Sequence, residues 1–410
     1  MTISRRQFVG GAAGVAAALE LPSVLAAQGQ GLKVAGILDG SGGLDIYGRP
    51  MIDCMRLAVE ETNAAGGLLD EPVELLLFDT QSNLQLYTQF ATEAATRHQV
   101  ASVHGGITSA SREAIRPLLG RYRTLYFYNT QYEGGACDRN IFCTGSTPAQ
   151  TVAKLVPHIM ERWGKRIYSL AADYNYGQTT ARWVRKFAQE SGGDAIATDF
   201  FPLDVTDFGP TIRKIQAAKP DIVVSVLVGG AHMSFYRQWA AAGMKGEIPL
   251  ASTTFGVGNE HRVLSEKESD GIIACYGYFE ELNTPANRDF LGRLRARYGD
   301  QTPAVNELAM RSYDAFLLWA EAVRRAGTAD RMAVIEALES NISMTSPSGT
   351  VTIDAPTHHT IQDVYLGEVS GGAFKVLETY REQPPADTAA VCDLVANPAD
   401  TTMYDINVDL

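Results

Sequence analysis

The sequence predicts an α/β protein with two Rossmann-like lobes, each holding a parallel sheet wrapped by helices. Short apolar runs alternate with amphipathic helical stretches along most of the chain, a pattern typical of parallel sheets. At 410 residues the chain is longer than one core of ordinary size requires, so two lobes are expected. Three turn-rich segments interrupt the alternation, at 142–151, 276–290 and 346–356. We expect these to be three hinge crossovers that join the lobes.

The first 26 residues are predicted to be an export signal rather than part of the fold. Ser4-Arg5-Arg6-Gln7-Phe8 precedes a weakly hydrophobic Gly/Ala-rich stretch, and Val24-Leu25-Ala26 suits a signal peptidase. We expect a twin-arginine signal peptide over 1–26, cleaved near Ala26, with an ordinary Sec signal as the alternative. No later stretch approaches the roughly 18 uncharged apolar residues of a membrane span. The expected location is the periplasm, in soluble form and without a lipid anchor.

The remaining elements follow in order from the alternation. Strands are expected at 32–39, 73–80, 100–106, 124–129, 166–173, 196–203, 221–228, 249–255 and 271–279. Helices are expected at 48–64, 83–97 and 109–120, and helical sequence follows the last of these strands to about residue 326. The crossovers then divide the chain into lobe 1 (31–146 plus 275–345), lobe 2 (147–274 plus 346–380) and an irregular tail (381–410).

Charge and cysteine content limit the function and the compartment. The formal net charge is −12 with a pI near 5.1, which argues against a general nucleic-acid or anionic-membrane binder. Cys54 and Cys275 lie in apolar periodic segments and are expected to be buried thiols. An exported protein is free to form disulfides, so we expect one bridge among Cys137, Cys143 and Cys392, with the pairing open.

Three motifs fall where strands are predicted to end. Open α/β sheets bind ligands beyond the carboxyl ends of their strands, where helix N-termini supply donors. "GGITSAS" (105–111) places Thr108 and Ser109 at such a point, although an ordinary helix cap would also explain these residues. Tyr128 and Thr130 end one strand, and Tyr174 and Tyr176 of "DYNYGQ" end another. If these side chains are not simple packing, they predict a cleft for a small polar solute.

Catalytic patterns are missing from the sequence. It contains no G-x-S-x-G elbow, no H-E-x-x-H, no P-loop and no G-x-G-x-x-G in the right context. His358-His359 has no cysteine or acid at ligand spacing and is expected to be surface or structural. The prediction is a binding protein, not an enzyme, without cofactor or metal.

Four longer segments carry a resemblance to a known family. They are "TSASREA" (108–114), "QYEGGACDRNIFCTGSTPAQ" (131–150), "YFEELNTPANRDFLGRLRARYG" (278–299) and "SGTVTIDAPTHHT" (348–360). The chain resembles type I periplasmic solute-binding proteins of ABC importers, in the branch of urea and short-chain-amide binders and the amide sensor of the aliphatic-amidase operon.

The resemblance implies a ligand site, a solute and partners. The ligand-binding residues would be Thr108, Ser109, Ala110, Tyr128, Thr130, Tyr174 and Tyr176. The solute would be urea or a short aliphatic amide, delivered by a monomeric receptor to an ABC permease with its ATPase subunits. The twin-arginine machinery would be the export partner, and nucleic acid is not an expected partner.

Other solutes and other classes of protein stay open. Gly177-Gln178 stands where the amide binders carry Pro-Arg and is closer to amino-acid binders of the branched-chain transporter type. An amino acid would need an acid for its ammonium group, such as Glu280 or Glu307. A ligand-sensing regulator shares this fold but lacks an export signal, and a secreted amide-processing enzyme would need the missing catalytic groups.

Overall fold

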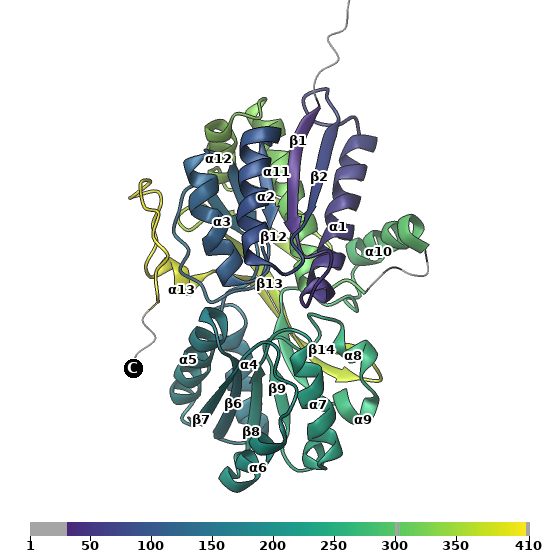
Figure 1. Ribbon diagram of the computed structural model, residues 1–410, viewed down its shortest axis with the longest axis vertical. Helices are drawn as coiled ribbons and strands as arrows, with labels where there is room; N and C mark the ends of the chain where they lie inside the picture. The colour runs from purple at the N-terminus through teal and green to yellow at the C-terminus, as the bar shows by residue number, and fades with distance from the viewer. Residues whose placement is uncertain (1–30, 300–301, 303, 407–410) are drawn as a thin grey trace, which may run out of the picture. The chain divides into compact units, whose positions relative to one another are not determined.

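The computed structural model describes residues 31–299, 302 and 304–406, so the predicted signal peptide lies outside the described residues. Its described part contains a curled, mostly parallel β-sheet of 14 strands flanked by helices (Figure 1). Ten of the strands form two groups on either side of β13. The first strand group is β1 (Leu32–Leu38), β2 (Val73–Asp79), β3 (Ser102–Gly105), β4 (Leu125–Tyr128) and β5 (Ile141–Cys143). The second strand group is β6 (Arg166–Ala172), β7 (Asp194–Phe201), β8 (Ile222–Val226), β9 (Leu250–Ser252) and β10 (Ile273–Tyr276).

Four further strands complete the sheet. They are β11 (Ser343–Ser346), β12 (Gly349–Asp354), β13 (His359–Ser370) and β14 (Ala373–Gln383). β13 pairs with β5 through His359 and Cys143, and with β10 in antiparallel register from Glu368 to Tyr365. Because β13 contacts a strand of each group, it makes the sheet continuous through the middle of the molecule (Figure 1).

Helices follow the strands as the alternation predicts. They are α1 (Asp45–Ala64), α2 (Leu84–Glu93), α3 (Ser109–Arg121), α4 (Val152–Trp163), α5 (Asn175–Glu190), α6 (Gly209–Ala218), α7 (Ala231–Ala241), α8 (Glu260–Val263), α9 (Glu266–Ser269), α10 (Pro285–Tyr298), α11 (Glu307–Ala326), α12 (Arg331–Glu339) and α13 (Ala386–Ala389). A π-turn at Ala94–His98 and a 3₁₀-turn at Met244–Gly246 complete the list. The α/β class predicted from the sequence is confirmed.

The strand predictions differ from the structure at the crossovers. Each of the nine predicted strands overlaps an observed one, and the turn-rich segment at 346–356 overlaps β11 and β12. β5, β13 and β14 are absent from the predicted strands. β14 is exposed or half-buried along most of its length, and β13 is buried along most of its length but carries polar residues such as Gln362 and Asp363, so neither reads as a continuous apolar run. The lobe boundaries given above stay a prediction.

The segment after β14 runs back to the loop that follows β4. Cys137 and Cys392 form a disulfide, whereas Cys54, Cys143 and Cys275 are buried free thiols. The tail also pairs by backbone hydrogen bonds, from Cys137 N–H to the Thr402 carbonyl (2.9 Å) and from Tyr404 N–H to the Gly135 carbonyl (2.8 Å). The tail is therefore an ordered part of the fold as far as residue 406.

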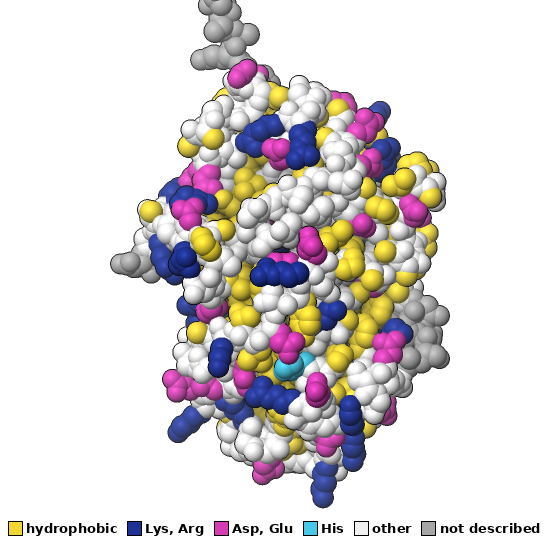
Figure 2. All heavy atoms as spheres, turned by 180° about the vertical axis from the view of Figure 1, so that it is seen from behind, with side chains coloured by type: hydrophobic (Ala, Val, Ile, Leu, Met, Phe, Trp, Pro, Cys, Tyr) yellow, Lys and Arg dark blue, Asp and Glu magenta, His cyan; other side chains and the backbone are white. Residues whose placement is uncertain are grey.

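The surface shows mixed charge. On the face in Figure 2, acidic and basic side chains are interspersed rather than gathered by sign, with apolar side chains between them. Among the described residues, every helix is too short or too polar to cross a membrane.

Candidate binding pocket

The candidate site is a narrow pocket at the carboxyl ends of both strand groups. Residues after β3 and β4 form one wall, and residues after β6, β8 and β9 form the other. The lining residues are Tyr47, Ile107, Ser109, Tyr128, Thr130, Gln131, Tyr174, Tyr176, Val228, Thr254, Val257 and Leu308. A pocket in this place follows the general rule that open α/β sheets bind ligands beyond the carboxyl ends of their strands.

The first wall is built around the start of α3. Gly105 has a φ of +144°, and a Cβ there would lie 2.1 Å from the Ile37 carbonyl oxygen, so only glycine fits the turn. Thr108 is the N-cap of α3 and forms a capping box with Ser111. The cap turns the next residue, Ser109, towards the pocket. The backbone amides of Ser109 and Ala110 have no acceptor among the described residues, as expected for the first turn of a helix.

Tyr128 and Thr130 fix the loop that leads into α3. The Tyr128 hydroxyl donates to the Ile107 carbonyl (3.0 Å), and the Thr130 hydroxyl donates to the Gly106 carbonyl (3.0 Å). Both side chains also line the pocket. They therefore serve the fold and the pocket wall at the same time, which the sequence motif alone did not reveal.

The second wall begins at α5. Tyr174 is the N-cap of α5 in extended conformation, but its side chain caps no amide. The Tyr176 hydroxyl donates to Thr253 Oγ1 (3.0 Å), while the Tyr174 hydroxyl has no hydrogen-bond partner among the described residues. Their ring centroids lie 6.1 Å apart, and both rings line the pocket. The two tyrosines of "DYNYGQ" thus share the pocket but differ in how they are held.

Gly177 and Gln178 serve the helix start rather than the pocket. A Cβ on Gly177 would lie 2.0 Å from the Ala172 carbonyl oxygen, so glycine permits the close approach of α5 to β6. Gln178 Nε2 donates to Asp173 Oδ1 (2.9 Å), and neither residue lines the pocket. The Gly-Gln pair is therefore explained by local packing.

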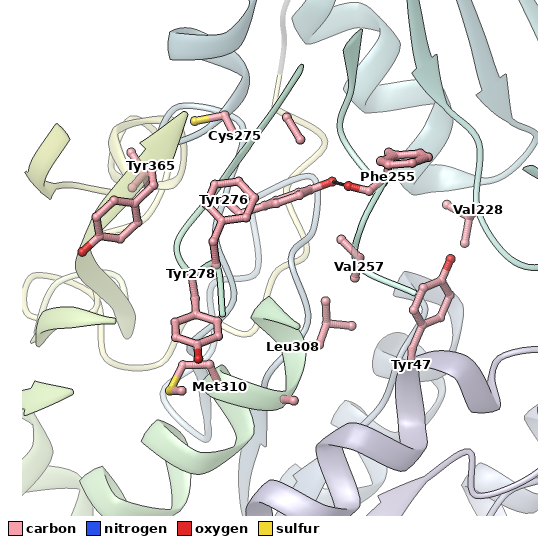
Figure 3. Packing of buried hydrophobic residues seen from close by; sticks show 14 of the residues in the cluster. Tyr47, Val228, Phe255, Val257, Cys275, Tyr276, Tyr278, Leu308, Met310 and Tyr365 are labelled. Carbon is pink, nitrogen blue, oxygen red and sulfur yellow. Dashed lines mark hydrogen bonds between the residues drawn. The ribbon is translucent and has the colours of Figure 1, made fainter. Parts of the chain in front are cut away.

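Several lining residues were not singled out from the sequence. Tyr47 on α1, Val228 after β8, Val257 after β9 and Leu308 on α11 converge from four elements, as Figure 3 shows. Tyr47 follows the glycine-rich turn after β1, so the strand-end rule could have found it. The three aliphatic residues have no sequence signal beyond hydrophobicity.

Gln131 and Thr254 were also missed. Gln131 Nε2 donates to the Thr253 carbonyl (2.7 Å), which links the two walls directly. The Thr254 hydroxyl donates to the Leu227 carbonyl (2.6 Å). Thr254 lies just beyond β9, so the same strand-end rule applies to it.

The pocket carries no charged lining side chain. Its four tyrosines are Tyr47, Tyr128, Tyr174 and Tyr176, and burial raises the pKa of each above the usual value. They are therefore neutral hydroxyls at any physiological pH. Glu133 lies behind Ser109 and accepts a hydrogen bond from its hydroxyl at 2.6 Å.

The hydroxyl groups of four lining residues already donate hydrogen bonds to other protein oxygens. Ser109, Tyr128, Thr130 and Thr254 each donate to a carboxylate or carbonyl oxygen, groups that cannot donate in return. Towards the pocket these oxygens can therefore act only as acceptors. Tyr47 differs, because its hydroxyl accepts from Gly229 N–H (3.0 Å) and keeps its own proton.

Other residues named from the sequence lie elsewhere. Thr108 and Ala110 are at the start of α3 but do not line the pocket. Glu280 pairs with Arg262 and Arg295, and Glu307 accepts from Ser146 (2.7 Å) in a neighbouring pocket.

The paired histidines are structural in this fold. His358 bonds Glu339 (3.0 Å) and His359 bonds the Thr357 carbonyl (2.7 Å), and both rings are buried. Within the described ranges, no cluster of three or more potential metal-ligating side chains occurs.

Comparison with known proteins identifies the family. Residues 31–373 match the periplasmic binding protein family, which covers most of the chain. The chain belongs to this family. It is 24% identical over 252 residues to Leu/Ile/Val-binding protein homolog 6 of Brucella melitensis, an alignment that covers 58% of this chain and 63% of the relative. The chain thus spans less than two thirds of that curated relative's length.

Solved structures share the fold. A solute-binding protein of an ABC transporter from Rhodopseudomonas palustris HaA2, in complex with p-hydroxybenzoic acid, has a TM-score of 0.79 at 24% identity, covering 86% of this chain and 98% of that one. A leucine-binding protein from Thermotoga maritima has a TM-score of 0.74 at 20% identity, covering 85% and 99%. These relatives are binding proteins rather than enzymes, in line with the reading of the sequence.

Proposed function

We propose that this periplasmic binding protein is the substrate-binding component of an ABC importer and that its solute is a short-chain aliphatic amide. The transport role is supported by membership of the family and by the ABC transporter protein that shares its fold. The periplasmic location, the export by the twin-arginine route and the monomeric state belong to the same proposal, as do the permease and ATPase partners.

The main support for an amide ligand is the set of hydrogen-bond acceptor oxygens in the pocket. Ser109, Thr130 and Thr254 present hydroxyl oxygens whose protons are used elsewhere, so they favour a ligand with N–H donors. The free amides at the start of α3 and the Tyr174 hydroxyl offer donors for one carbonyl oxygen. A primary amide carries two N–H donors and one carbonyl acceptor and satisfies both kinds of group.

The aliphatic lining favours an amide with a hydrocarbon chain over urea. Ile107, Val228, Val257 and Leu308 offer apolar surface that urea, with no apolar atom beyond its single carbon, would leave without a partner. Burying each methylene of an aliphatic chain contributes about 0.8 kcal/mol. A chain of three to five carbons would use this surface.

Two charged alternatives fit less well. An amino acid would bring an ammonium group, and neither Glu280 nor Glu307 lines the pocket to pair with it. A carboxylate with an apolar body is the second candidate, because the unpartnered amides of α3 and α5 suit an anion and the relative from R. palustris holds p-hydroxybenzoic acid. A carboxylate whose body is purely apolar would offer no donor to the acceptor oxygens of Ser109, Thr130 and Thr254.

Binding would act by shifting a conformational population. Ser109 and Thr130 follow strands of the first group, and Tyr174 and Thr254 follow strands of the second. A solute that bonds both walls favours the arrangement in which the walls are close, and a permease then recognises that arrangement.

Thermal unfolding with matched ligands tests the solute. 4-Methylpentanamide, 4-methylpentanoate and leucine share one carbon skeleton and differ only in the head group, while urea and acetamide lack the chain. The protein without residues 1–26 is melted with each compound. Specific binding stabilises by about 2.7 kcal/mol at a hundred times Kd. We expect the largest shift with 4-methylpentanamide, and a larger shift with leucine or the acid would overturn the amide assignment.

A further inference from the structure

We propose that Glu133 is a specificity-determining positioning residue: it fixes the direction of the Ser109 hydroxyl proton and so makes the pocket select N–H donors over carboxylates. The proposal deepens the function given above and rests on it. It concerns a residue behind the pocket wall that contacts the solute only through Ser109.

Both carboxylate oxygens of Glu133 are engaged. Oε2 accepts from the Ser109 hydroxyl at 2.6 Å, and Oε1 accepts from Arg112 Nη2 at 3.0 Å. Glu133 is 3% exposed, so water offers the carboxylate little competition. A short bond to a carboxylate is a strong one, and it holds the hydroxyl proton away from the pocket.

Arg112 is held in place from several sides and cannot exchange partners easily. It is fully buried, its Nε donates to Glu113 Oε1 (2.9 Å), and its guanidinium lies over the rings of Tyr128 (5.0 Å) and Tyr132 (4.4 Å). Because Arg112 holds Oε1, only Oε2 is free to meet Ser109. The arginine thereby fixes which carboxylate oxygen faces the pocket wall.

These hydrogen bonds decide whether the Ser109 hydroxyl donates or accepts on the pocket side. An ionised carboxylate can only accept, so the Ser109 hydroxyl must donate to it and can only accept on the pocket side. A glutamine at position 133 would keep its carbonyl on Arg112 and turn its NH₂ group to Ser109. Ser109 would then accept from residue 133 and point its proton into the pocket.

The matched test is Glu133→Gln against Glu113→Gln. Both variants remove one carboxylate that contacts Arg112, but only Glu133 touches Ser109. Calorimetric titration gives Kd for 4-methylpentanamide and 4-methylpentanoate with each protein. We expect Glu133→Gln to lower the amide-over-acid preference about tenfold, the size of one reversed hydrogen bond, and Glu113→Gln to leave the preference as in the wild type.

Further variants separate positioning from general disruption. In a Ser109→Ala background, Glu133→Gln should no longer change the preference, because the hydroxyl that it reorients is gone. Ser109→Ala alone should weaken the amide and leave the acid unchanged or tighter, and this variant tests the proposal even if Glu133→Gln does not fold. Melting without ligand shows which variants are folded.

The outcomes distinguish the two proposals. An amide preference in the wild type that Glu133→Gln leaves intact overturns the role of Glu133 alone. The role also fails if Glu113→Gln shifts the preference equally, or if Ser109→Ala weakens both ligands alike. A wild type that prefers the acid, or binds neither compound, overturns the proposed function and the role of Glu133 together.

Discussion

The helices α3 and α5 begin at the same pocket but begin differently. α3 has a capping box between Thr108 and Ser111, and behind it Arg112 and Glu133 form a buried ion pair. α5 begins at Tyr174 with no side-chain cap, and the amides of its first turn have no acceptor among the described residues. Both helix starts leave backbone amides free, but only α3 has a side-chain cap.

This difference gives the two walls of the pocket different roles in stability and binding. The α3 wall presents acceptors whose positions are set by the fold, so little ordering is needed when a solute arrives. The α5 wall keeps unpaired donors, at the Tyr174 hydroxyl and at its first backbone amides, which a solute or water must satisfy. We therefore expect changes on the α3 side to alter stability first, and changes on the α5 side to alter binding first.

The largest expected effect comes from the disulfide behind the α3 wall. Cys392→Ser should lower the free energy of unfolding by about 2–5 kcal/mol, because the bond closes a very long loop. The tail also meets α5 at the exposed Arg182–Asp405 pair, and Asp405→Asn should change stability by less than about 1 kcal/mol. Urea unfolding without reductant measures both. Equal losses would remove the contrast between the walls.

The next effect is a loss of stability in acid, on the α3 side. Burial lowers the pKa of His104, just before Gly105, to about 3, and lowers that of His359 to about 4. Below pH 6.5 these histidines bind protons in the unfolded chain but stay neutral in the folded protein. Stability therefore falls as pH falls from about 6.5 towards 4.

His104→Gln measures one part of this slope. Between pH 7 and pH 5, the free energy of unfolding of the variant should fall by about 2 kcal/mol less than that of the wild type. This difference does not depend on the stability of the variant at pH 7. Urea midpoints at several pH values give the comparison, with the partly exposed His98→Gln as control. A slope unchanged by His104→Gln would show that the pKa of the ring is the same in the folded and unfolded states.

Two tyrosine-to-phenylalanine changes compare the walls most directly. Tyr128→Phe leaves the buried Ile107 carbonyl without its donor and should cost about 1–3 kcal/mol of stability. Tyr174→Phe removes a hydroxyl with no partner among the described residues, so stability should hold while amide affinity falls about threefold to tenfold. Thermal melting and ligand titration of both variants give the comparison, and a stability loss in Tyr174→Phe would show that the hydroxyl serves the fold.

The smallest effect tests the cap itself. Thr108→Ala removes the N-cap of α3 and should cost about 1 kcal/mol, whereas Thr108→Ser should be nearly neutral. Because Thr108 does not line the pocket, the amide affinity of the folded protein should stay within about twofold. A large affinity loss with unchanged stability would place Thr108 at the ligand instead.

Much of the fold follows from local pattern, and the rest depends on distant contacts. The strands of both groups are short apolar runs between turn signals, which periodicity detects. β14 and β13 are different, because β14 is mostly exposed or half-buried and β13 buries polar residues among its apolar ones. The choice of Cys392 as the partner of Cys137 depends on where the tail returns, which no local pattern encodes.

The pocket shows the same division. Ser109, Tyr128, Thr130, Tyr174 and Tyr176 all line it, as the strand-end rule and the resemblance led us to expect, and their part in binding stays a prediction. The aliphatic residues could not be predicted, because a buried valine in a pocket looks like any valine of the core. The direction of each hydroxyl proton depends on neighbours such as Glu133, 24 positions from Ser109.

The disulfide also sets an order of events in time. Its cysteines stand 255 positions apart, and every strand of the sheet precedes Cys392 in the chain. During synthesis, Cys137 is therefore made long before its partner Cys392. The bond can therefore close only after every strand of the sheet has been made.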